Sequence, residues 1–94
     1  MKVEIILLAA YKLIAGKGKI TLELEENTSV QAVVLQLVKR QPGLKRAWLD
    51  PTGNLQPHLH IFLNGDDIST LADGLETKLV DKDELEFIPP LSGG

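Results

Sequence analysis

The chain has 94 residues, of which 44% are hydrophobic and 24% are charged, and its formal net charge at pH 7 is -3. These values describe one small domain with little interior for a deep catalytic cavity, so we expect a binding module or carrier rather than an enzyme. The absence of cysteine excludes disulfides, thiolate nucleophiles and cysteine-ligated metal sites, and it fits a reducing compartment.

Two predicted strands open the chain and form a hairpin. Residues 2–10 are rich in Ile and Leu and alternate only partly with polar residues, which is typical of a central strand. Residues 15–18 supply turn-forming glycines, and residues 20–24 then alternate apolar with polar side chains. The first apolar run is too short and too interrupted for a signal peptide or a membrane span, so we expect a cytoplasmic protein without a membrane partner.

A predicted amphipathic helix follows, with Thr28 or Ser29 as its N-cap. Its hydrophobic positions recur at i, i+3, i+4, i+7 and i+8 and form one continuous stripe: Val30, Val33, Val34, Leu37 and Val38. Pro42-Gly43 is predicted to end this helix. Residues 44–49 are compatible with a short helical turn before a loop at residues 50–54.

A second hairpin and a last strand complete the chain. Residues 58–63 alternate and lead into Asn64-Gly65, a strong tight-turn signal, after which residues 66–68 are predicted to return as a short strand. Residues 71–79 are predicted to form an irregular or single-turn crossover. Residues 84–88 alternate again, which indicates one more strand.

This order of elements predicts an α+β protein with the β-grasp, ubiquitin-like fold. About five strands would form a mixed sheet packed on one main helix, with the first and last strands paired at its centre. We expect residues 1–88 to form this domain and residues 89–94 to project from it as a flexible tail.

The charged residues suggest no nucleic-acid partner. The ten basic residues are scattered along the chain rather than gathered in a phosphate-binding stripe. The acidic residues between positions 66 and 84 are predicted to be mostly solvated loop charges, some of them available to a basic groove on a partner.

Strand alternation predicts two faces of the sheet. If Val3, Ile5 and Leu7 face the helix, the opposite, outer face holds a contiguous apolar group, which is typical of an interface. The predicted docking face consists of Ile6, Leu8, His60, Phe62 and Ile88. Alternatively, residues 44–57 cover this face, through Trp48. His58 would share it with His60, but we expect no metal site because the local spacing places no third ligand beside them.

The last residues are predicted to project from the domain as a tail: Pro89, Pro90, Leu91, Ser92, Gly93 and Gly94. The prolines have no N–H and fix φ, so they end strand pairing. The two glycines have no Cβ, which allows the backbone to enter a narrow channel. Ser92 is interpreted as a small polar spacer, and an inert, frayed end is the alternative for the whole tail.

The hairpin turn at residues 64–68, the run from Leu79 to Pro90 and the final double glycine resemble ubiquitin-like sulfur carrier proteins, which include the small subunit of molybdopterin synthase and the thiamine-pathway carrier. The resemblance implies that an E1-like enzyme uses ATP to adenylate the Gly94 carboxylate. Sulfur transfer would then yield a thiocarboxylate for a sulfur-accepting synthase, such as the large subunit of molybdopterin synthase. The carrier itself would bind no cofactor, would leave catalysis to its partners and would be a monomer when free.

The resemblance leaves the pathway open. Residues 7–13 lack the aromatic pair and the Arg-Glu expected of molybdopterin synthase, and the insertion at residues 50–57 resembles longer carriers for cysteine synthesis or archaeal-type small modifiers. One alternative is therefore a protein modifier joined through Gly94 to lysines of target proteins. The other is a β-grasp binding module with an inert tail.

Overall fold

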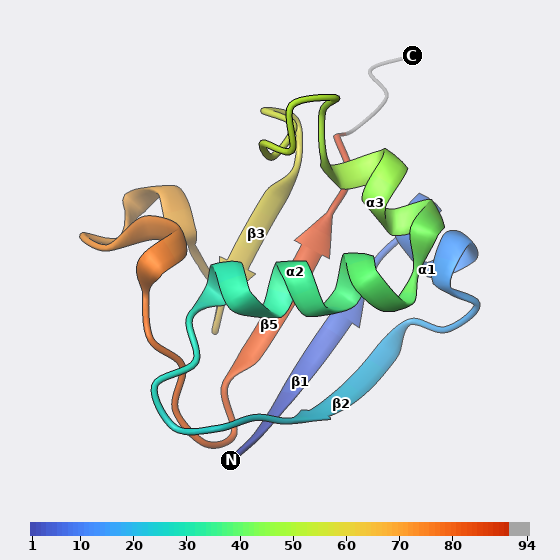
Figure 1. Cartoon of the computed structure of the whole chain (residues 1–94). Coiled ribbons are helices and arrows are strands. Elements are labelled where there is room, and N and C mark those ends of the chain that lie inside the picture. Colours follow the sequence, from blue (N-terminus) through green and yellow to red (C-terminus); the bar gives the residue numbers. More distant parts are fainter. Residues whose placement is uncertain (91–94) are drawn as a thin grey trace.

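The computed structural model describes residues 1–90, which form one mixed sheet with the helices on one of its faces (Figure 1). The elements are β1 (Lys2–Leu7), α1 (Ala10–Ala15), β2 (Lys19–Glu23), α2 (Val30–Arg40), α3 (Pro42–Trp48), β3 (His60–Leu63), β4 (Asp66–Asp67), the 3-10 turns η1 (Ile68–Thr70) and η2 (Gly74–Glu76), and β5 (Glu84–Ile88). The strand order is β2-β1-β5-β3-β4. The predicted α+β, β-grasp arrangement is confirmed. No helix in the described range is long and apolar enough to cross a membrane.

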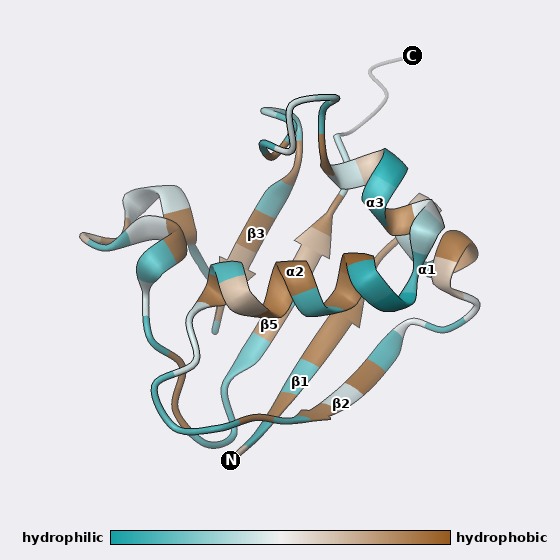
Figure 2. Cartoon of the chain, in the orientation of Figure 1, coloured by the Kyte–Doolittle hydropathy of each residue, from teal (hydrophilic) through white to brown (hydrophobic). Residues whose placement is uncertain are grey.

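The centre of the sheet is the parallel pair of the first and last strands, as predicted. Ile5 lies opposite Leu85, and Leu7 lies opposite Phe87. Figure 2 shows teal and brown segments along β5, whereas the second half of β1 is brown throughout, as expected of a central strand that is apolar on both faces. The helix-facing residues are all buried, as the alternation predicts: Val3, Ile5, Leu7, Ile61, Leu63, Leu85 and Phe87.

Helix α2 packs its apolar stripe on this inner face. All five predicted stripe residues are buried. Ser29 is the N-cap, and its Oγ accepts a hydrogen bond from the Ala32 N–H at 3.1 Å, which satisfies one of the free donors at the helix start. The sequence therefore predicted both the beginning of this helix and its buried side.

The predicted first strand extends too far. β1 ends at Leu7, Ala9 has a left-handed φ of 50°, and helix α1 then fills the connection to β2. Gly16, with φ of 78°, ends that helix, and a positive φ is a conformation that glycine adopts without a steric penalty. The short helix places Tyr11 in the core, a burial that strand alternation alone could not reveal.

The role predicted for Pro42 also needs correction. α2 ends two residues earlier, and Pro42 begins α3; at the first position of a helix its missing N–H removes no intrahelical bond. The expected helical turn is thus a full helix. It carries Trp48, which is fully buried, stacks on Phe87 with ring centroids 4.5 Å apart and meets Tyr11 edge to face at 5.6 Å.

Asn64 and Gly65 form the predicted hairpin turn, with φ values of 50° and 90°. The return strand is shorter than expected, because Ile68 belongs to η1. Asp83 is a buried acid, not a solvated loop charge: its carboxylate accepts hydrogen bonds from Asn64 Nδ2 and the Val80 N–H, both at 2.8 Å. This pairing ties the hairpin turn to the beginning of β5.

Candidate functional site

The residues that the structure describes end just after β5, a central strand of the sheet. β5 pairs with β1 on one side and with β3 on the other, and Ile88 lies opposite His60. Pro89 and Pro90 follow outside any strand. The candidate tail residues Leu91, Ser92, Gly93 and Gly94 lie outside the described residues. The last strand pairing of the described residues therefore lies in the middle of the sheet, beside α3 and the loop before β3 (Figure 1).

A hollow of about 550 Å³ lies against the two prolines. Segments that are distant in sequence meet there, and its lining includes Tyr11, Ile14, Arg46, Gln56 and His58. Sequence reasoning missed this hollow, because α1 and the loop before β3 carried no recognised motif. His58 was predicted to share a strand face with His60, but it lies in a turn before β3 begins.

Tyr11 is almost completely buried beside this hollow. Within residues 1–90 its hydroxyl has no hydrogen-bond partner, and burial raises its pKa above the ordinary value for a tyrosine. The phenol is therefore neutral at physiological pH. We assign it a packing role, supported by its edge-to-face contact with Trp48.

The five residues of the predicted docking face lie close together on the outer face of the sheet. Across the strands, Ile6 lies opposite Glu86, Glu86 opposite Phe62, and His60 opposite Ile88. Ile6, Phe62 and Ile88 are half-buried, whereas Leu8 and His60 are exposed. The main chain of Leu8 continues the pairing, since its N–H donates to the Phe87 carbonyl at 3.3 Å.

The alternative that Trp48 covers this face is wrong. Trp48 stacks on Phe87, which belongs to the inner side of the sheet together with α2. Leu44 and Trp48 therefore complete the core from the helical side. The outer face stays accessible next to the point where the tail begins.

Sequence reasoning missed Glu86, which lies between Ile6 and Phe62 at the middle of the docking face. The signal was available, because Glu86 has the same strand parity as Ile88. Within the described range it forms no ion pair. The face thus offers one carboxylate bordered by aliphatic and aromatic side chains, a pattern that fits a partner with a cationic side chain surrounded by apolar contacts.

The described residues contain no group of three or more metal-ligating side chains. His60 accordingly contributes a polar, exposed edge to the docking face.

Comparison with known proteins agrees with this geometry. Residues 5–94 match the model of the ThiS family. Small archaeal modifier protein 3 of Haloferax volcanii is 28% identical over 94 residues, the full length of both chains. A putative sulfur carrier protein of Archaeoglobus fulgidus is 31% identical over 79 residues, which are 84% of this chain and 88% of that protein.

Among solved structures, the small archaeal modifier protein 1 of Methanosarcina acetivorans superposes with a TM-score of 0.83 at 34% identity, covering 99% of this chain and 96% of that one. Sequence and fold are thus shared along essentially the whole length. This chain belongs to the ThiS family of small ubiquitin-like carrier and modifier proteins.

Proposed function

We propose that this protein is a sulfur carrier that uses the carboxylate of Gly94. An E1-like enzyme would join that carboxylate to AMP from ATP and release pyrophosphate. Hydrosulfide released by a sulfur donor would then attack the acyl carbon and displace AMP, and the resulting thiocarboxylate would donate its sulfur to a synthase. The observation that carries the proposal is the family match, which extends through the double glycine to residue 94.

The position of β5 supports this cycle. A strand paired on both sides is a rigid support, and the prolines at its end cannot extend the pairing. A tail attached there leaves the domain at one defined place, beside Leu8, His60 and Ile88. An activating enzyme could therefore hold the docking face and receive the terminal carboxylate at the same time, while catalytic side chains remain on the partner.

The second candidate function is protein modification. A relative named as a small archaeal modifier matches over its full length, and the same acyl adenylate can react with a lysine amine to form an isopeptide bond. The relative named as a putative sulfur carrier favours the first candidate. We place sulfur transfer first because it needs only the activated carboxylate and a sulfur donor. The synthase would be the molybdopterin synthase large subunit or an equivalent acceptor.

The deciding measurement is the intact mass of the protein after incubation with its E1-like enzyme, ATP and a sulfur source. We expect the mass to rise by the difference between one sulfur and one oxygen atom, and the change to require ATP. Isopeptide-linked remnants of Gly94 on other proteins, with no sulfur incorporated, would instead establish modification. An unchanged mass with an enzyme of verified activity would contradict the sulfur-carrier proposal, and the absence of conjugates as well would contradict both candidates.

Replacement of Phe62 by Asp should weaken binding to the activating enzyme by roughly tenfold or more, because aromatic anchors dominate interface energies. The new carboxylate would also lie directly across from Glu86 and repel it. Isothermal titration with the E1-like enzyme measures the change. Gln31→Asp, on an exposed site of α2, adds the same charge on the helical side and should bind normally. Equal affinities of the two variants would refute the assignment of the docking face.

A further inference from the structure

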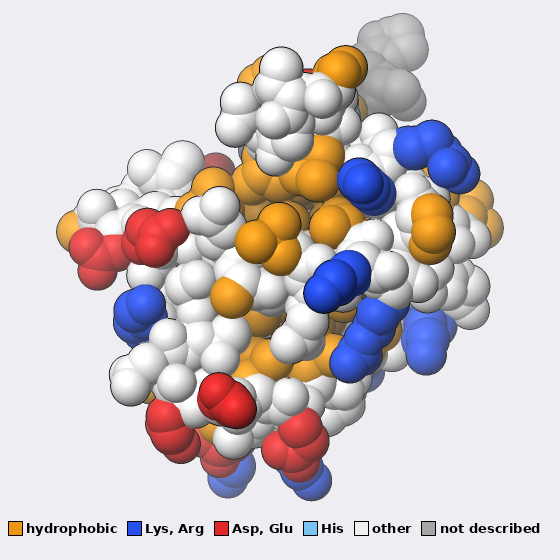
Figure 3. All heavy atoms as spheres, in the orientation of Figure 1, with side chains coloured by type: hydrophobic (Ala, Val, Ile, Leu, Met, Phe, Trp, Pro, Cys, Tyr) orange, Lys and Arg blue, Asp and Glu red, His pale blue; other side chains and the backbone are white. Residues whose placement is uncertain are grey.

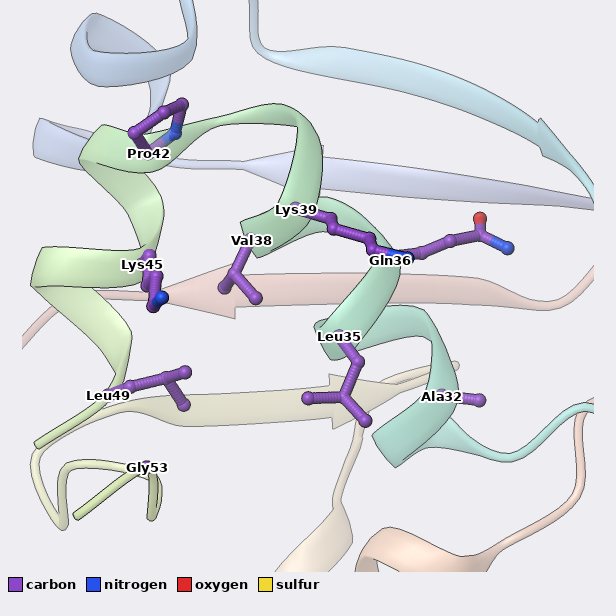
Figure 4. A pocket seen from close by; sticks show the side chains of 9 residues that line it. All are labelled: Ala32, Leu35, Gln36, Val38, Lys39, Pro42, Lys45, Leu49 and Gly53. Carbon is purple, nitrogen blue, oxygen red and sulfur yellow. The ribbon is translucent and has the colours of Figure 1, made fainter.

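A second surface lies on the opposite side of the molecule, in the layer of helices. A groove of about 860 Å³ separates α2 from α3 and from the loop that follows α3. Figure 4 shows Leu35, Val38 and Leu49 directed toward this space, with Gln36 and Lys39 pointing away from it. Leu35 is 50% exposed in the middle of a helix, so the groove presents apolar surface to solvent.

The groove is preformed rather than a gap that loose side chains could fill. The 50–54 loop contributes Gly53 to its outer wall, and in this loop Asp50 Oδ1 accepts hydrogen bonds from the Thr52 hydroxyl at 2.6 Å, the Thr52 N–H at 2.9 Å and the Asn54 N–H at 3.0 Å. The bond from the Thr52 hydroxyl, with those from the backbone, lowers the pKa of Asp50. Gly53, at φ of 86°, closes the turn. The free-energy cost of ordering this wall when a ligand binds would therefore be small.

The charged side chains that line the groove are both basic, and Asp50 lies in the neighbouring loop. Residues 27–49 contain four basic residues and no acidic one, although the whole chain has a net charge of -3. Lys39 and Lys45 border the groove, Lys39 with its side chain pointing outward, and Arg40 and Arg46 follow them in sequence. In Figure 3 the hydrophobic side chains gather at the centre of this face, with Lys and Arg along one side and acidic side chains mainly toward the far edges. These basic residues are close together in the sequence, at the end of α2 and within α3.

We propose that this groove binds an amphipathic helix of a partner protein, with leucine-like side chains on one face and acidic residues along its edges. Apolar anchors would contact Leu35 and Leu49, and carboxylates would pair with Lys39 and Lys45, which is the usual way in which a groove receives a helix. Because the groove lies on the helical side and the docking face on the other side of the sheet, both surfaces can be occupied at once.

Two other occupants fit less well. A symmetric dimer through this groove would place Lys39 and Lys45 against the same lysines of a second copy, and like charges repel. A nucleic acid would find cations, but none of the residues that line the groove is an aromatic side chain on which bases could stack. The apolar floor with a basic edge selects a protein helix.

The test is selection from a displayed library of helical peptides. Their hydrophobic positions vary among Leu, Ile, Met and Phe, and their edge positions vary between acidic and basic residues. We expect the full chain to enrich peptides with acidic edges. Leu35→Asp should weaken the binding of the enriched peptides by roughly tenfold or more. Leu35→Gln, the uncharged control, should weaken their binding less. The charge-reversed double variant Lys39→Glu, Lys45→Glu should instead enrich peptides with basic edges.

Several outcomes would overturn this assignment. The assignment is wrong if the native chain enriches no peptide, or if it enriches peptides with basic edges. It is also wrong if the enriched peptides bind the Leu35→Asp variant as tightly as the native chain, or if Phe62→Asp abolishes their binding. A concentration-dependent dimer abolished by Leu35→Asp would identify a second copy as the occupant, and binding of single-stranded RNA lost with the lysine reversal would identify a nucleic acid. Leu35→Asp should leave the mass change of the tail intact, so failure here and failure of the sulfur-carrier proposal are separable.

Discussion

Deletion of Gly93 and Gly94 is expected to abolish both thiocarboxylate formation and any conjugation, while the domain remains folded. The variant would end on Ser92, so the activating enzyme would meet a side chain and a shorter reach where it should find glycine. Within residues 1–90, the buried cluster ends at Phe87, well before the deleted pair. Intact mass after activation measures the chemistry, and circular dichroism measures the fold.

Two single variants, which both keep the terminal carboxylate, test whether activation requires glycine at the end of the tail. Gly94→Ala keeps a terminal carboxylate and adds one methyl group. A strong loss of sulfur incorporation in this variant would therefore indicate a narrow channel in the activating enzyme. Ser92→Ala keeps both glycines and should be activated normally. If the deletion variant still acquired sulfur at its new end, Gly94 would not be the acyl donor.

Replacement of Trp48 by Ala is expected to destabilise the protein by about 3–5 kcal/mol, the usual cost of removing a large buried aromatic side chain. Trp48 is fully buried, stacks on Phe87 and contacts Tyr11, so its loss would leave a cavity between α3, α1 and the sheet. A domain of this kind has only about 5–15 kcal/mol of stability in total. Urea denaturation followed by circular dichroism measures the change.

Trp48→Phe is the matched control. The indole Nε1 has no hydrogen-bond partner within residues 1–90, so the smaller ring removes volume without breaking a bond. We expect this variant to lose clearly less stability than Trp48→Ala. A loss below about 1 kcal/mol for the Ala variant would mean that the site collapses around the gap, and α3 would then contribute little to the core.

Local patterns in the sequence were sufficient to predict the sheet and the main helix. Alternation assigned Leu85 and Phe87 to the inner face and Phe62 to the outer one, because successive side chains of a strand point to opposite sides. The hydrophobic stripe of α2 and its Ser29 cap follow from helical periodicity in the same way. Asn64-Gly65 formed the expected turn because its positive φ values suit these two residues.

Local patterns failed where a contact between distant segments decided the structure. Tyr11 belongs to a short helix because it packs against Trp48, which is far away in the sequence. Asp83 is buried because Asn64 and the main chain of Val80 supply its hydrogen bonds, and no spacing rule predicts such a pairing. His58 joined the hollow beside Pro89 because the chain turns before β3 begins.

The sequence by itself determined the β-grasp order, the buried side of each central strand and the proline pair that precedes the double glycine, since each depends on residues close together in the chain. Only the tertiary structure decided that Trp48 completes the core from the helical side, that Glu86 lies between Ile6 and Phe62, and that Lys39 and Lys45 border one apolar groove. The physical reason is that strand register and helix packing, which bring distant residues together, are set by the whole core rather than by any one segment.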